Sequence, residues 1–386
     1  MHMTYRTIGV LCVCVAISLV GVYFAFTSQS PEECAPISEQ KKQEGSQGYR
    51  VWFGETLKSF EHTGKSVCVP DGWEAVGATE EGEGWARFSR DHTGVIVKSD
   101  AFGILTLTPE KSAYTITVLY PLSTKSDALN RYVQIISNAF SRVGALLPES
   151  KSAKHSHTVL ITAGLGGDTR SEGTRVYPDP TENMSVMVRT PDQPRAEELF
   201  VHAVMHLFNR HRGDLLAYQK NQNPFPAEDW QEMEATWSET AFSTQNEGRT
   251  ARIRYLYNVH VAVRTNNFSR IVSEPFNNKE AFEKIKQGSI VPEGSQYLDY
   301  QYGHYVLAPL TMVAIEGLLV SRSSDLHVED ILKAIHTRPS LNFFDELGKK
   351  LSKDDMARIM LWIEGKDTIP EELVMKGLSH YILSPQ

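Results

Sequence analysis

The sequence predicts an α+β protein built from an N-terminal transmembrane helix, a β-rich domain and a mainly helical domain. Three observations predict this order. Residues 8–26 carry no charge, and short runs of alternating apolar residues begin at about residue 49. After about Pro194 the apolar residues recur at helical spacing to the end of the chain. With 386 residues, 41% hydrophobic and 22% charged, the chain can form two or three domains with buried cores.

The N-terminal segment IGVLCVCVAISLVGVYFAF is long enough to cross a bilayer as a helix. Arg6 precedes it, and positive flanks stay in the cytoplasm. We therefore expect residues 1–27 to be a signal anchor of a single-pass membrane protein, with the N-terminus cytoplasmic and the bulk of the chain extracytoplasmic. A cleaved signal peptide is the alternative, but its apolar region is usually shorter and no clear small-x-small cleavage site follows.

Charge and cysteine content narrow the classes of partner. The formal net charge of −8 offers no attraction for nucleic acid, so we expect none as a partner. No CxxC pair is present, which argues against a cysteine-bound zinc ion. Cys12 and Cys14 lie inside the apolar span, whereas Cys34 and Cys68 would both face the oxidising side and can pair, although spacing alone does not establish a disulfide.

The remaining chain divides into a stalk and two domains. Residues 28–48 are polar and predict a flexible stalk, followed by a β-rich domain at 49–122. Within it, AYTITVLY (residues 113–120) alternates as a half-buried strand does. Residues 123–386 form the second domain, with an α/β lobe at 123–195 and a helical lobe at 196–386.

The α/β lobe is predicted to begin with a helix, capped by Ser126 or Asp127 and stopped by Pro148. Strands are then expected at 158–163 and 184–190. The apolar stripe of the helix is formed by Leu129, Val133, Ile136, Phe140, Val143 and Leu147.

The segment FVHAVMHLFNRH (residues 200–211) places His202 and His206 four residues apart, on one face of a helix. This spacing suits two nitrogen ligands of one zinc ion, but HxxxH also occurs by chance, so a third ligand is needed. EMEATWSETAFS (residues 232–243) offers Glu234 and Glu239, which are five apart and do not share a face. The flanking aromatic residues Trp237 and Phe242 favour Glu239 as the ligand.

Four segments together resemble a known family: HAVMHLFNRHRGD, EATWSETAF, YQYGHYVLAPLTMVAIE and LWIEGKDTIP. In order and spacing, over about residues 197–370, they are similar to the gluzincin metallopeptidases, nearest the glycyl aminopeptidase-like branch. The resemblance implies a thermolysin-like, mainly helical domain of catalytic type. It also implies one Zn²⁺ held by His202, His206 and Glu239, Tyr300 steadying the oxyanion, and a peptide or protein as substrate or ligand.

The chain departs from the family pattern in three places. Ala203 stands where HExxH has its general-base glutamate, and Tyr302 stands where a lysine is often found. The loop GLGGDTRSEG matches the family's substrate-edge strand poorly, with Glu172 as the residue that would face a peptide amine. Glu198, four residues before His202, is expected either to bind an imidazole or to be a surface carboxylate.

Ala203 separates metal binding from hydrolysis. A methyl group cannot take a proton, and losing general-base help costs on the order of 10²–10⁴ in rate, whereas the proposed zinc ligands remain. The sequence therefore predicts a catalytically impaired, aminopeptidase-like homologue that binds peptides or acts as a scaffold. Two alternatives stay open: a zinc hydrolase that uses another base or is a trapped catalytic mutant, and a metal-free interaction ectodomain. No oligomeric state is indicated.

Overall fold

The computed structural model describes residues 57–60, 66–76, 78–88, 94–110, 114–146, 155–161, 175–176, 184–187, 191–192, 195–211, 227–265, 303–364 and 366–383. The chain divides into two compact units, Met1–Asp100 and Ala101–Gln386. Strands dominate the first unit and helices the second, as expected of an α+β protein. None of the helices in the described ranges is both long enough and apolar enough to cross a membrane. The predicted anchor at 8–26 and the stalk at 28–48 lie outside those ranges.

The described residues of the first unit form two small antiparallel sheets, each of three strands. Ala86, Phe88 and Ile96 form its buried cluster. Gly84, with a φ of 75°, makes the tight turn between two strands of one sheet, a conformation that glycine adopts without strain. One sheet has the order β1-β6-β3, with bounds β1 (Leu57–Phe60), β6 (Gly94–Lys98) and β3 (Trp73–Val76). The other has the order β2-β5-β4, with bounds β2 (Ser66–Cys68), β5 (Trp85–Arg87) and β4 (Glu80–Gly82).

Cys68 in this unit is part of a disulfide. The other three cysteines of the chain lie outside the described residues. The pairing of Cys68 with Cys34 therefore stays a prediction.

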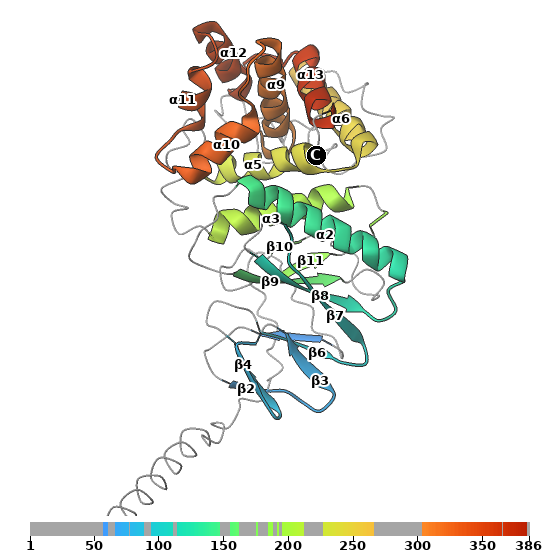
Figure 1. Ribbon diagram of the computed structural model, residues 1–386. Helices are drawn as coiled ribbons and strands as arrows, with labels where there is room; N and C mark the ends of the chain where they lie inside the picture. Colours follow the sequence, from blue (N-terminus) through green and yellow to red (C-terminus); the bar gives the residue numbers. More distant parts are fainter. Residues whose placement is uncertain are drawn as a thin grey trace, which may run out of the picture. The chain divides into compact units, whose positions relative to one another are not determined.

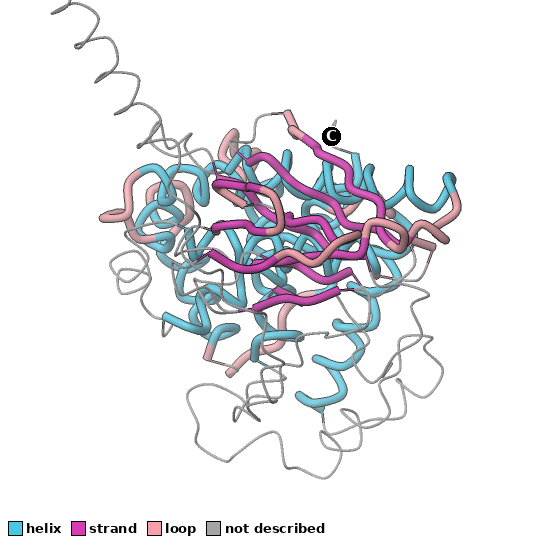
Figure 2. The backbone as a smooth tube through the Cα atoms, turned by 90° about the horizontal axis from the view of Figure 1, so that it is seen from below, coloured by secondary structure: helices cyan, strands magenta, loops and turns pink. Residues whose placement is uncertain are grey.

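The second unit is built on a five-stranded mixed sheet with the order β10-β11-β9-β8-β7. Figure 1 labels these strands, and Figure 2 draws the described strands in magenta. The central strands β8, β9 and β11 are parallel, and the outer two pair antiparallel. The bounds are β7 (Phe102–Leu107), β8 (Tyr114–Pro121), β9 (His155–Ile161), β10 (Arg175–Val176) and β11 (Met184–Met187).

The boundary between the units differs from the expected one at residue 122. The strand predicted at 113–120 is present as β8, but β8 pairs with β9 and so belongs to the second unit together with β7. Alternation in the sequence shows that a strand has one buried face without showing which sheet it joins. Pairing with β9, more than thirty residues later, decides this.

Helix α2 (Ser126–Leu146) crosses from β8 to β9 and covers one face of the sheet (Figure 1). Ser126, one of the two predicted caps, is already its first helical residue: the carbonyl oxygen of Lys125 accepts the N–H of Leu129 at 2.9 Å, so Lys125 occupies the N-cap position. Its buried stripe includes Tyr132, Ile136 and Phe140, and the Phe140 ring lies 5.5 Å from that of Tyr114 on β8. Helix α3 (Ala196–His211) packs beside α2 on the same side of the sheet (Figure 1).

The rest of the described chain is helical, as the spacing after Pro194 predicts. Helix α9 is buried along almost its whole length and crosses α13 closely. A Cβ at Gly317 would lie 1.9 Å from the carbonyl oxygen of Leu373, so glycine is required at this crossing. The elements are α5 (Ala227–Phe242), α6 (Asn246–Thr265), the π-turn η2 (Gly303–Leu307), α9 (Ala308–Ser321), α10 (Val328–Thr337), α11 (Phe343–Gly348), α12 (Lys353–Ile363) and α13 (Glu371–Leu383).

The free energy of unfolding of this unit is expected to depend on pH through a buried histidine, His260. His260 on α6 is fully buried, and its Nε2 accepts the N–H of Ile369 at 3.1 Å. Burial, helped by Arg264, lowers its pKa from 6.5 to about 4. As the pH falls, the unfolded chain takes up this proton before the folded chain does. Stability is therefore full above pH ~6.5 and declines by roughly 3 kcal/mol towards pH ~4.

His260→Gln keeps an acceptor for Ile369 but does not titrate. Urea unfolding between pH 7.5 and pH 4.5 is expected to show a shallower loss of stability in this variant than in the wild type. Equal losses in both proteins would show that His260 is not the titrating group.

Candidate metal centre

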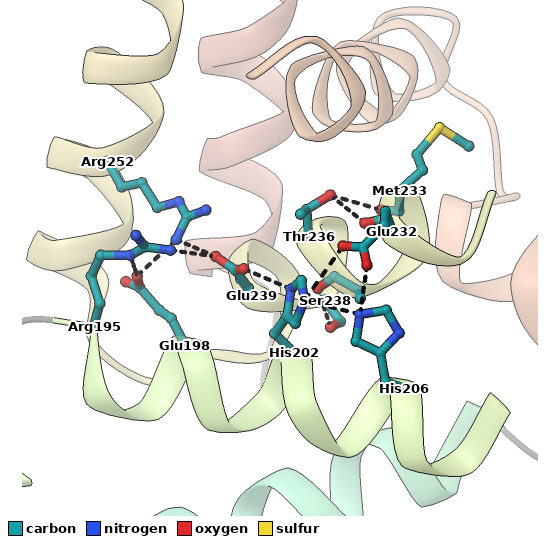
Figure 3. Close-up of polar contacts among 11 residues, drawn as sticks. Arg195, Glu198, His202, His206, Glu232, Met233, Thr236, Ser238, Glu239 and Arg252 are labelled. Atoms are coloured by element: carbon teal, nitrogen blue, oxygen red, sulfur yellow. Dashed lines mark hydrogen bonds and ion pairs between the residues drawn. The ribbon is translucent and has the colours of Figure 1, made fainter. Parts of the chain in front are cut away.

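Helix α3 holds its two histidines by burying the opposite face. Phe200, Val204 and Phe208 are buried in the main hydrophobic core. His202 and His206 therefore point away from that core towards α5, and their side chains stay 16% and 14% exposed (Figure 3). The helical face predicted from the i,i+4 spacing is the face observed.

The two histidines and Glu232 on α5 form a compact group of three potential metal ligands. The Nε2 atoms of His202 and His206 lie 3.0 Å apart. The carboxylate of Glu232 lies 3.3 Å from Nε2 of His206 and 3.6 Å from Nε2 of His202. A tetrahedral zinc ion with bonds of 2.0–2.1 Å separates its ligand atoms by about 3.3 Å. The donor set and its spacing therefore fit one zinc ion.

Glu239, the carboxylate predicted from the sequence as the third ligand, lies on the other side of His202. Its Oε1 is 2.8 Å from Nδ1 of His202, the ring nitrogen that faces away from the group of three. A carboxylate at Nδ1 orients a metal-binding imidazole and keeps the proton off its other nitrogen. The geometry thus gives the ligand position to Glu232 and an orienting position to Glu239.

The sequence does contain a signal for Glu232 as a candidate ligand, namely its seven-residue spacing from Glu239. Seven residues are about 700° around a helix, 20° short of two full turns, so both side chains leave the same face of α5. Glu234 leaves a different face: it is fully buried, accepts from Nδ2 of Asn209 at 3.0 Å and lies 3.3 Å from Nε2 of His336.

Two arginines fix the charge of Glu239 (Figure 3). Arg195, just before α3, approaches it at 3.0 Å, and Arg252 of α6 pairs with the same oxygen. Burial opposes ionisation of Glu239, but Arg252, Arg195 and His202 together lower its pKa to about 2. Glu239 is therefore an ionised carboxylate held behind His202.

Glu198 belongs to the same buried network. It is 1% exposed and lies 3.3 Å from Arg195 and 3.4 Å from Arg252. Burial raises its pKa, although both arginines oppose that shift. The sequence-based expectation of a surface carboxylate or an imidazole partner is therefore wrong. The periodicity of the sequence does not indicate this buried network, because Arg252 comes from α6, more than fifty residues away.

The other predicted site residues are placed as follows. Ala203 is 4% exposed on α3, directly after His202. Tyr300 and Glu172 lie outside the described residues. Tyr305, in the π-turn before α9, has its ring 6.4 Å from that of His202 and nearly parallel to it, at 25°. Tyr305 was not selected from the sequence, because it is one of several tyrosines in YLDYQYGHY and nothing in its spacing distinguishes it.

Comparison with known proteins gives weak likenesses only. No protein-family model matches the chain, and no curated protein matches it either. Among solved structures, an aminopeptidase N family protein from Idiomarina loihiensis aligns over 81% of this chain and 57% of its own, with 10% identity and a TM-score of 0.48. An M1 zinc metallopeptidase from Deinococcus radiodurans aligns over 79% of this chain and 64% of its own, with 12% identity and a TM-score of 0.38. The chain thus spans less than two thirds of either protein, and TM-scores below 0.5 do not assign it to their family.

Proposed function

We propose that the second unit is a zinc-binding relative of the gluzincin metallopeptidases, aminopeptidase-like in type. The observation that carries the proposal is the convergence of His202, His206 and Glu232, with ligand atoms 3.0–3.6 Å apart. Two histidines, one glutamate and an open position are the donor set of a catalytic zinc site. Zinc bound there acidifies a water molecule and polarises a carbonyl group.

We further propose that hydrolysis is impaired. Ala203 has no group that can take a proton from water. Of the carboxylates described around the histidines, Glu232 is assigned to the metal. Glu239, with a pKa of about 2, is a very weak base, and Glu198 is enclosed by arginines. Binding of peptides, without rapid turnover, is the function that this arrangement supports best.

The site is proposed to work outside the cytoplasm. The uncharged segment at 8–26 supports a membrane anchor with the N-terminus inside, and the disulfide at Cys68 is consistent with an oxidising compartment. Peptides or protein segments reaching that compartment are then the proposed ligands.

Zinc analysis of Glu232→Gln tests the metal site. An amide is a much poorer zinc ligand than a carboxylate, so this variant is expected to lose one equivalent of zinc or to bind it at least tenfold more weakly. Glu234→Gln is the matched control on the same helix, because Glu234 faces Asn209 and His336 instead. Full zinc retention by Glu232→Gln, or equal losses in both variants, would contradict the proposed ligand set.

A further inference from the structure

A second group of potential metal ligands lies among the C-terminal helices. It consists of Glu316 on α9, His327 at the start of α10 and His380 on α13. One ligand atom from each lies within 4.8 Å of the others. None of these residues belongs to the metal centre on α3 and α5, and the proposed function does not use them.

The two imidazoles converge on one carboxylate oxygen. Oε1 of Glu316 lies 2.7 Å from Nδ1 of His327 and 3.5 Å from Nε2 of His380. The two rings stack with centroids 4.2 Å apart and planes 17° from parallel, so they approach from the same side. The other oxygen of Glu316 accepts the N–H of Val328 at 2.9 Å, which fixes the carboxylate in place.

The two distances from Glu316 to the imidazoles are close to those of a metal-bound set, and all three ligand atoms lie within 4.8 Å of one another. Ligand atoms of a tetrahedral ion are about 3.3 Å apart. The contact from Glu316 to His380 already has this length, and the contact to His327 must open by about 0.6 Å. A rotation of the His327 side chain, which is 33% exposed, can supply that opening.

The carboxylate of this group is buried, whereas its two imidazoles are partly exposed. Glu316 is fully buried, and its carboxylate is held in place by the N–H of Val328, by His327 and by a hydrogen bond with Tyr381. The imidazoles of His327 and His380 remain 33% and 26% exposed, so both metal-binding side chains are in contact with solvent. Two imidazoles and one carboxylate favour borderline transition metals over calcium or magnesium.

We propose that Glu316, His327 and His380 form a second site for a divalent transition metal ion, with zinc as the test ion. Bound there, the ion joins α9, α10 and α13. It would reinforce the crossing at which Gly317 lets α9 and α13 approach closely. The site goes beyond the proposed peptidase-like function and does not depend on it.

Zinc stoichiometry in four full-length proteins tests this inference. The wild type is expected to bind two equivalents. His206→Ala, which disables the first site, and His380→Gln, which disables the second, are each expected to bind one, and the double variant none. His380 is preferred to His327 for substitution because His327 caps α10.

Thermal unfolding of His206→Ala supplies an independent measurement. Added zinc is expected to raise its melting temperature, and the double variant should show no such rise. Glu316→Gln in the His206→Ala background keeps an acceptor for Val328 and should also lose the rise.

The outcomes separate the two sites. If His206→Ala binds no zinc, or if His380→Gln and Glu316→Gln leave its zinc content and melting response unchanged, the second site is overturned. If His206→Ala binds as much zinc as the wild type while His380→Gln binds none, the first site fails and the second stands.

Discussion

Ala203→Glu is expected to raise the rate of peptide hydrolysis by about 10²–10⁴-fold, equivalent to roughly 3–5 kcal/mol of activation free energy. The substitution adds a carboxylate directly after His202, on the helix that carries both histidines. In the proposed function this is the position of the general base, so the carboxylate would take a proton from water, which no alanine can do. The measurement is cleavage of aminoacyl anilides with free amino termini by the zinc-loaded variant beside the wild type.

Ala203→Gln is the matched control. Ala203 is 4% exposed, so any longer side chain perturbs the packing of α3, and glutamine does so without adding a base. If Ala203→Glu cleaves the substrate and Ala203→Gln does not, the gain in activity is due to proton transfer and not to the larger side chain. A wild type that already cleaves at the rate of Ala203→Glu would show that the present site is not impaired.

Glu239→Ala is expected to destabilise the second unit by about 3–5 kcal/mol, because it leaves two arginines, one of them buried, to share the single carboxylate of Glu198. Arg252 is almost completely buried, and only Glu198, at 3.4 Å, would remain as its partner among the described carboxylates. Arg195 would likewise lose its 3.0 Å contact. Urea unfolding at pH 7 in the presence of a chelator measures this loss without the contribution of metal.

Glu232→Ala is the comparison for that experiment. Glu232 is 17% exposed and lies beside histidines, so its removal from metal-free protein should cost far less than removal of Glu239. A loss below 1 kcal/mol for Glu239→Ala would mean that water or a rearranged arginine neutralises the network. The orienting role assigned to Glu239 would then have no energetic support.

The local elements of the second unit were accessible from the sequence because they depend on periodicity. The alternation at 113–120 predicts β8, and the apolar stripe from residue 129 onward predicts α2. Each of these predictions needs only the neighbours of a residue along the chain.

Features that depend on distant pairing were not accessible in the same way. β8 joins the second unit because it pairs with β9, which lies beyond a helix of 21 residues. The flanking aromatic residues favour Glu239 over Glu234 and give no sign of Glu232, whereas the geometry depends on how α5 lies against α3. The charge of Glu239 depends on Arg252, on yet another helix. Spacing identifies candidates, and only the packing of helices selects among them.

The central claim is that His202, His206 and Glu232 hold one zinc ion, and X-ray absorption at the zinc edge tests it most directly. The His380→Gln protein is suited to this measurement because it lacks one ligand of the proposed second site. It is expected to show two imidazole nitrogens at about 2.0–2.1 Å and a carboxylate oxygen at a similar distance, the latter lost when Glu232→Gln is added. A zinc shell without imidazole, or one that Glu232→Gln leaves unchanged, would contradict the account.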